Sequence, residues 1–97
     1  MRIISRRPLR LFSELHPDSR KQLEAWFYEV RRAHWQNANE LSGRFASASI
    51  LKGGRVIFNI CGNRYRLVVW INFERQLVLI RFVGTHLEYD KIDAESI

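Results

Sequence analysis

The chain has 97 residues, 46% of them hydrophobic and 12% aromatic, which is enough for one modest core and too little for two domains. Lys and Arg number 16 against 10 Asp and Glu, so the formal net charge is +6 and a polyanionic partner is favoured. The single Cys excludes an internal disulfide. The sequence has no signal-peptide pattern and no apolar run near the ~20 residues that a membrane span needs. We therefore expect one cytoplasmic domain, residues 1–97, outside the membrane.

The first third of the chain predicts a short strand and two helices. Residues 2–5 form the candidate strand. A helix follows from about Pro8, because proline is tolerated in a first helical turn and apolar residues then recur at three-residue spacing up to His16. Ser19 and Gln22 have the spacing of a capping box, so a second helix is expected to start here and run to about residue 34. Its apolar face has helical spacing: Leu23, Trp26, Phe27 and Val30.

The remaining residues predict a loop and then a sheet. Residues 36–54 are rich in Asn, Ser, Ala and Gly and are expected to be mainly loop, with one helical turn near 40–45. Residues 55–61, 64–72 and 76–83 are rich in Val, Ile and aromatic residues and are separated by hairpin-length turns. We therefore expect an α+β fold: an N-terminal strand, two helices and a three-stranded antiparallel meander, with the helices packed on one face of the sheet.

Side-chain alternation predicts which residues face away from the helices. Between residues 65 and 71, Arg66 and Trp70 lie opposite an apolar row that suits the helices: Leu67, Val69 and Ile71. In the last strand, a second apolar row is formed by Val78, Ile80 and Phe82. Arg81 lies opposite this row and is expected to share the open face with Arg66.

The excess positive charge lies on this predicted sheet. Residues 41–87 contain seven basic residues and one acid, Glu74. If the strand register places Arg55 and Asn59 on the open face, that face becomes a shallow, positively charged trough suited to a nucleic acid. The alternative is that these arginines only solubilise the surface of the sheet.

We expect five side chains on and beyond the predicted strands to be catalytic. Their residue types are those found in small ribonucleases that work without a metal. An arginine can bind a phosphate bidentately and keeps its charge, and an imidazole can give or take a proton near neutral pH. The three His and one Cys show no metal-ligand spacing, and no metal or cofactor is expected. The candidates are Arg66, His86, Arg81, Tyr89 and Asp90.

Each of these candidates also has a purely structural interpretation. His86 can bond backbone groups in a strand-end loop, and Arg81 can form an ion pair with Glu88 or Asp90. The ring of Tyr89 can pack at the edge of the core. The acidic C-terminal segment is expected to be a solvated end, in preference to a flap that mimics the substrate.

The order of elements and several segments resemble the HigB toxins of the RelE-like family of type II toxin–antitoxin systems. The resemblance covers essentially the whole chain, through MRIISRRPL, AHWQN, GGRVIFNICGNRYRLVV and IRFVGTHLEYDKID. It implies a RelE-like fold and a ribosome-dependent mRNA endonuclease that uses the 2′-hydroxyl of the RNA as nucleophile. It also implies a HigA-type helix-turn-helix antitoxin, through which alone the protein would contact operator DNA.

The resemblance also bears on single residues. Arg66, after the tyrosine of the YRLV motif, matches the phosphate-contacting arginine of the family, whereas His86 stands where RelE relatives often have an arginine. Basic residues that some relatives carry on the first meander strand are missing around Ile57 and Asn59. The RNA-binding candidates that can supply this charge or a stacking surface are Lys52, Arg55, Asn59, Arg64 and Trp70.

Two other functions remain open from the sequence. The same basic face would serve a non-enzymatic RNA- or ribosome-binding module. A structural or transcription-related protein that acts only in a complex is the second alternative. Both differ from the nuclease hypothesis in requiring no proton transfer by His86.

Overall fold

The computed structural model describes residues 1–97 and contains one five-stranded sheet. The order of strands is β1-β5-β4-β3-β2, with β1 parallel to β5 and all other pairs antiparallel. The strands are β1 (Arg2–Ile4), β2 (Ser49–Ile50), β3 (Arg55–Ile60), β4 (Tyr65–Asn72) and β5 (Leu77–Thr85). The helices are α1 (Arg7–Leu15), α2 (Arg20–Arg32), α3 (Ala38–Arg44) and the single turn α4 (His86–Tyr89).

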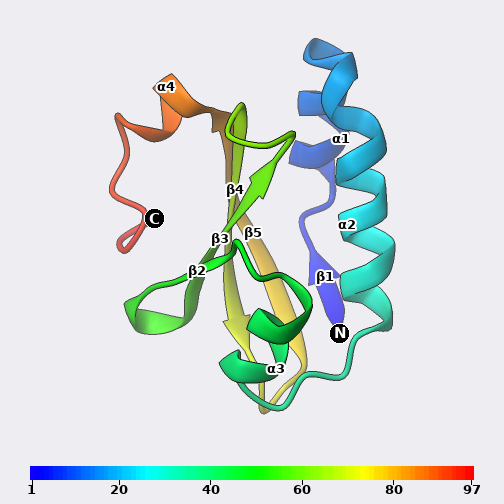
Figure 1. Ribbon diagram of the computed structural model, residues 1–97, viewed down its shortest axis with the longest axis vertical. Helices are drawn as coiled ribbons and strands as arrows, with labels where there is room; N and C mark the ends of the chain where they lie inside the picture. The colour runs from blue at the N-terminus through cyan, green and yellow to red at the C-terminus, as the bar shows by residue number, and fades with distance from the viewer.

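Figure 1 shows α1 and α2 together on one side of the sheet and the C-terminal segment on the other. This arrangement confirms the predicted α+β fold with the helices on one sheet face. The predicted meander corresponds to β3, β4 and β5, and the predicted N-terminal strand is β1 at the sheet edge. No helix is both long and apolar enough to cross a membrane.

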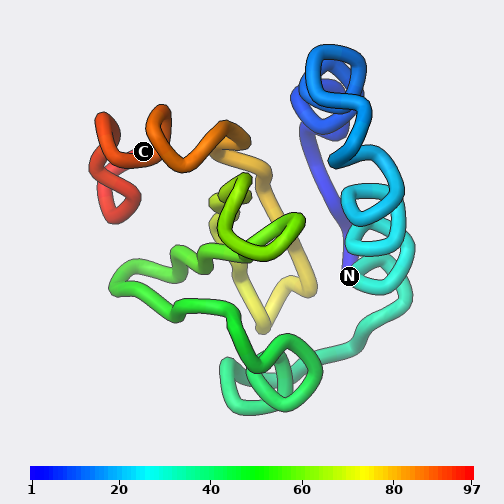
Figure 2. The backbone as a smooth tube through the Cα atoms, turned by 45° about the horizontal axis from the view of Figure 1, so that its top comes forward, coloured from blue at the N-terminus to red at the C-terminus, as the bar shows by residue number.

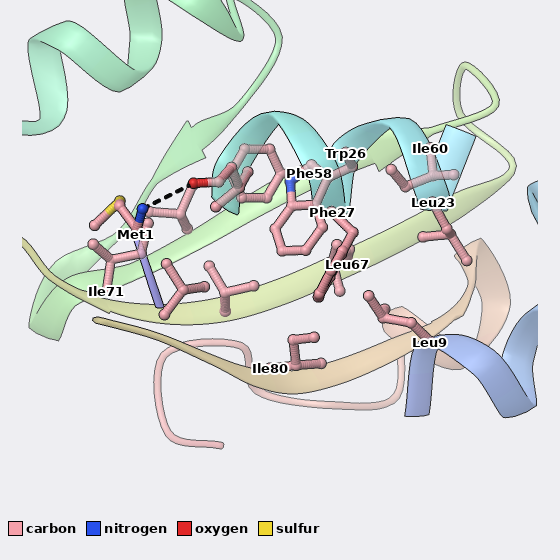
Figure 3. Close-up of a cluster of buried hydrophobic side chains, with 14 of the residues drawn as sticks. Met1, Leu9, Leu23, Trp26, Phe27, Phe58, Ile60, Leu67, Ile71 and Ile80 are labelled. Atoms are coloured by element: carbon pink, nitrogen blue, oxygen red, sulfur yellow. Dashed lines mark hydrogen bonds between the residues drawn. The ribbon is translucent and has the colours of Figure 1, made fainter. Parts of the chain in front are cut away.

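The main core lies between the helix pair and the sheet (Figure 3). The predicted apolar face of α2 is buried, and the indole of Trp26 meets the ring of Phe58 edge to face at 5.3 Å. Leu67, Val69 and Ile71 face this core as alternation predicted. The burial of these large apolar side chains is the main favourable contribution to folding, at about 1.5–3 kcal/mol for each fully buried one.

The N-terminus is tied to the end of α2. The amino group of Met1 donates hydrogen bonds to the carbonyls of Val30, Arg31 and Ala33 at 3.2, 3.0 and 2.6 Å, the first of which is drawn in Figure 3. These bonds satisfy carbonyl groups that the end of a helix leaves without partners. Partial burial lowers the pKa of this amino group. The positive charge also lies where the helix dipole favours a cation.

A β-bulge interrupts the pairing of β4 with β5. Val68 pairs with Phe82 and Val69 pairs with Ile80, so Arg81 is an extra residue without a partner on β4. The bulge reverses the alternation along β5, because it inserts one residue into a strand with a two-residue side-chain period. Ile80 therefore packs in the helix-side core, whereas Phe82 packs on the opposite face. The prediction that both belong to one row was wrong for this reason.

Other local predictions were also wrong. Ser19 does not cap α2 with its side chain; it is fully buried, and its hydroxyl donates to the carbonyl of His16 at 2.7 Å. The Gln22 side chain instead accepts a hydrogen bond from the backbone N–H of Cys61. In the region predicted to be mainly loop, the helical turn expected near residues 40–45 is present as the longer helix α3, whereas the short strand β2 was not predicted.

The C-terminal segment is not a solvated end. Figures 1 and 2 show it folding back beside the sheet, away from the helices. Ala94 is only 8% exposed and packs with Ile57 and Val68. The guanidinium of Arg55 donates two hydrogen bonds to the carbonyl of Ile97, at 3.1 and 2.6 Å. The middle of the face predicted to be an open basic trough is therefore apolar and covered, because Ile57, Val68 and Phe82 need a partner there.

This packing makes a prediction about Ala94. In Ala94→Glu, a carboxylate would have to be buried against Ile57 and Val68, which is unfavourable enough to release the segment. We expect trypsin to cut after Lys91 about tenfold faster than in the unmodified chain, because cleavage follows the population of the open form. The matched control is Glu95→Gln, at an exposed neighbouring position. Equal cleavage rates in all three proteins would show that Ala94 does not hold the segment in place.

Candidate active site

The candidate site lies where β4 begins, β5 ends and α4 follows. Arg66 pairs in register with Gly84, and α4 starts two residues later at His86. The guanidinium carbon of Arg66 lies 5.8 Å from the centre of the Tyr89 ring, within the range of a cation–π contact. Its Nη1 donates to the carbonyl of Asn63 at 3.2 Å and, more weakly, to that of Tyr65 at 3.5 Å. The Nε and Nη2 groups donate to no protein atom and remain free for an anion.

His86 and Asp90 form the second part of the site. Nδ1 of His86 lies 3.1 Å from Oδ2 of Asp90, one helical turn further on, and both side chains are about half exposed. The backbone N–H of His86 also donates to the carbonyl of Arg64 at 3.0 Å. The carboxylate fixes the orientation of the imidazole, as carboxylate partners of histidine commonly do. Nε2 has no protein partner and is the nitrogen available for proton exchange.

The single turn of α4 is held by its own capping groups. The Thr85 hydroxyl accepts from the backbone N–H of Glu88, and the Glu88 carboxylate accepts from the backbone N–H of Thr85 at 2.8 Å. The hydrogen bond from the backbone N–H of Thr85 to the carboxylate is the main reason that the pKa of Glu88 is lowered. The pattern is a capping box, T-x-x-E, which is readable in the sequence. It was missed because residues 86–90 were interpreted only as a strand-end loop.

Gly84 is required at its position next to Arg66. A Cβ there would lie 2.5 Å from Cζ of Phe82 and 3.1 Å from Oε1 of Glu88. The Phe82 ring therefore crosses directly over the glycine, and it packs against the apolar cluster that contains Ala94 of the C-terminal segment. Gly84 allows Phe82 to fill this corner and allows α4 to begin close to the strand.

Asp18 ties the start of β4 to the helix layer. Its Oδ2 accepts from Nη1 of Arg64 and its Oδ1 accepts from the hydroxyl of Tyr65, both at 2.6 Å. The hydrogen bond from Tyr65 is the main reason that the pKa of Asp18 is lowered, and the same bond raises the pKa of Tyr65. The ring of His16 lies 5.2 Å from that of Tyr65 and stacks on Phe12. Nothing in the sequence pattern indicated this contact of Asp18.

The structure separates the predicted catalytic residues into two groups. It brings Arg66, His86, Tyr89 and Asp90 to the corner formed by β4, β5 and α4. Arg81 lies on the bulge of β5, is exposed and forms no ion pair, so its predicted alternative pairing with an acid is absent. Tyr89 also contributes to the small apolar cluster under the C-terminal segment, as its structural interpretation proposed.

The predicted RNA-binding residues are dispersed. Asn59 pairs in register with Arg66 and donates to the carbonyl of Ser47 at 3.4 Å, so it lies beside the corner. Arg55 and Trp70 pair with each other at the opposite end of the β3–β4 hairpin. Lys52, just before β3, is exposed and has no hydrogen-bond partner. Arg64 points to Asp18 and the helix layer, not to the face that carries Arg66.

Comparison with known proteins identifies the family. Residues 19–92 match the HigB toxin family, described as the RelE-like toxic component of a toxin-antitoxin system. The chain belongs to this family. The mRNA interferase toxin HigB of Escherichia coli (strain K12) is 30% identical over 92 residues, which cover 93% of this chain and 88% of that protein. The mRNA interferase HigB of Shigella flexneri matches with the same figures, and that of Escherichia coli O6:H1 is 22% identical over 94 residues.

The family match covers the whole candidate site of this HigB-family chain. Arg66, Gly84, His86, Tyr89 and Asp90 all lie within residues 19–92, whereas α1 lies outside them. The structure contains no group of three or more His, Cys, Asp or Glu side chains placed to hold a metal ion.

The Asp18 contact predicts a pH dependence of stability. Because the pKa of Asp18 is lowered on folding, its ionised form stabilises the fold above the ordinary carboxyl value of 3.8, and this contribution is lost as the pH falls through the lower folded value. We expect Asp18→Asn to lower the thermal midpoint at pH 6 and to flatten its decline between about pH 5 and pH 2. The control is Glu74→Gln, at an exposed acid without an ion pair. If the thermal midpoint depended on pH in the same way in all three proteins, Asp18 would not be the cause of the pH dependence.

Proposed function

We propose that this HigB-family chain is the toxin of a toxin–antitoxin system and that it acts as an endonuclease on messenger RNA at the ribosome. The observation that carries the proposal is the corner at which Arg66 offers unpartnered N–H groups beside α4, which carries His86 oriented by Asp90. The names of the relatives, mRNA interferases, support the same reaction. A binding module without catalysis would not need an imidazole held by a carboxylate and left free at Nε2.

The proposed reaction uses only groups of the protein and the RNA. The 2′-oxygen of a ribose attacks the adjacent phosphorus, its proton passes to a base, and the bond from phosphorus to the 5′-oxygen breaks. The departing 5′-oxygen takes up a proton from an acid, which leaves a 2′,3′-cyclic phosphate and a 5′-hydroxyl. The free Nε and Nη2 groups of Arg66 would stabilise the charge that develops on the phosphoryl oxygens.

His86 would carry out one of the two proton transfers. Asp90 holds Nδ1, so the proton is exchanged at Nε2. Tyr89 would keep the Arg66 guanidinium in position through its ring face. Arg81, on the bulge, would add a second positive charge along the strand that leads to the corner.

The bound RNA would run from the corner around the C-terminal segment, which covers the middle of this face of β3 and β4. Asn59 lies across from Arg66 and is placed to contact the nucleotide at the scissile bond. Trp70 would stack on a base further along, and Lys52 and Arg55 would attract phosphates near it. Arg64 would contribute mainly through its contact with Asp18.

Membership of a toxin–antitoxin family gives the chain an antitoxin partner. We propose that this antitoxin is of the HigA type, carries a helix-turn-helix domain and binds the operator DNA on behalf of the complex. With the ribosome and mRNA as its proposed targets, the protein would act in the cytoplasm.

Arg66 provides the first test of the reaction. In Arg66→Ala, cleavage of mRNA on programmed ribosomes should be about 10²-fold slower, because one donor to a developing negative charge is lost. Arg66→Lys should recover part of the rate, since it restores the charge without the planar donor pair. Arg75→Ala, at an exposed position in the β4–β5 turn, is the matched control. The proposal fails if Arg66→Ala cleaves at the normal rate.

His86 provides the second test. His86→Ala should slow cleavage by about 10²- to 10⁴-fold with RNA binding unchanged, because proton transfer is lost. Asp90→Asn should have a smaller effect, since the imidazole keeps its place in the chain but loses the carboxylate that orients it. Leu87→Ala, at an exposed position of the same helical turn, is the control. Normal cleavage by His86→Ala with unchanged binding would favour a mechanism without this histidine.

A further inference from the structure

A groove with a volume of about 420 Å³ runs between α1 and α2. Figures 1 and 2 show these two helices side by side, on the other side of the sheet from α4 and the C-terminal segment. The guanidinium groups along the groove come from Arg6, Arg7, Arg10 and Arg20. None of these residues belongs to the candidate active site, and three of them precede the residues matched by the family.

The positive charge of the groove is largely unneutralised. Glu24 is its one acidic residue and pairs with Arg20 at 3.5 Å. Arg7 and Arg10 are exposed and form no ion pair or side-chain hydrogen bond. The Arg6 guanidinium lies over the Phe27 ring, 4.1 Å from its centre, and this cation–π contact holds the charge at the groove. A bound anion would therefore meet preorganised charge there.

The start of α1 increases this positive potential. A helix begins with free backbone N–H groups and a partial positive charge, which acidic or capping residues usually offset. Here α1 has no acidic residue in its first turn and no side-chain cap, and three arginines occupy positions 6, 7 and 10 instead. Such an arrangement is unfavourable for the isolated chain and becomes favourable when an anion binds.

The floor of the groove favours a nucleic-acid strand over an acidic protein segment as the polyanion that binds there. Leu9, Leu23 and Phe27 are each less than 9% exposed, so the floor offers little apolar surface in which a side chain of a protein segment would anchor. Arg6 and Arg10 are one helical turn apart, about 6 Å along the axis, which is comparable with the separation of neighbouring phosphates in a strand. All four cations are arginines, whose planar donors suit phosphate oxygens.

We propose that the groove between α1 and α2 binds the phosphate backbone of RNA, as a second RNA-binding surface on the side of the sheet opposite Arg66. This inference rests on the proposed function, because RNA is the polyanion that an mRNA endonuclease meets. Since the groove lies away from the corner at α4, it adds affinity without contacting the bond that is cut.

Salt-dependent binding of a labelled single-stranded RNA tests the groove. Each protein carries Arg66→Ala so that cleavage of the RNA is slow during the measurement, and fluorescence anisotropy gives Kd between about 50 and 200 mM KCl. Adding Arg7→Ala and Arg10→Ala should raise Kd and lower the slope of log Kd against log salt by about 1.4, for two lost phosphate contacts. The matched control adds Arg31→Ala and Arg32→Ala, which remove the same charge from exposed positions of α2 outside the groove. An unchanged slope in the groove variant, or an equal change in the control, overturns the proposal.

A cleavage assay separates this inference from the proposed function. With Arg66 intact, the Arg7→Ala, Arg10→Ala variant should need more RNA for half-maximal cleavage and keep the rate at saturating RNA. If the unmodified protein cleaves normally but the groove variant has unchanged RNA binding, the groove inference fails alone. If no protein cleaves while the slope still changes as expected, the proposed function fails and the RNA-binding groove stands.

An acidic protein segment is the competing occupant. Poly-L-glutamate, titrated against the same variants, is the probe. If the two groove substitutions abolish binding of poly-L-glutamate but leave RNA binding intact, the groove accepts acidic protein and the RNA proposal is wrong. Unchanged thermal midpoints of the variants, expected for exposed arginines, ensure that folding does not account for either result.

Discussion

The β-bulge at Arg81 is the constraint on which the candidate site depends. It lets Val78 and Ile80 pack beneath the helices while Phe82 and Gly84, further along the same strand, belong to the other face. An uninterrupted strand would direct Phe82 into the helix-side core. The register between Arg66 and Gly84 would then shift by one residue, and α4 would leave the sheet in another direction.

The corner at the end of β5 is built around one aromatic ring. Phe82 crosses Gly84 and packs against the apolar cluster of Ile57, Val68 and Ala94, to which Tyr89 also contributes beside Arg66. Asp18 acts from the helix side by holding Arg64 and Tyr65, the two residues before Arg66. The arginine that would bind phosphate is therefore positioned from both faces of the sheet, as preorganised charge requires.

The sequence was sufficient for features that depend on local periodicity. The apolar spacing of residues 23–30 and the alternation of residues 65–71 correctly predicted the second helix and the face that carries Arg66. Features created by a single inserted residue or by distant contacts were not predictable in this way. The bulge at Arg81 has no composition signal, and the contacts of Asp18 and Ala94 join residues far apart in the chain. At Ser19 a local pattern gave a wrong prediction: the capping spacing is present, but the side chain is buried and its hydroxyl donates to the carbonyl of His16.

The single turn of α4 has a consequence for how the corner behaves on heating. A helix of four residues has no independent stability, so His86 and Tyr89 are ordered only while the capping groups, the strand end and the returning C-terminal segment hold together. The central strands β3, β4 and β5 contain many buried residues, whereas α4 contains none. Local opening of α4 is thus a smaller cooperative event than global unfolding, and catalytic geometry would be lost from a molecule whose sheet and helix layer are still intact.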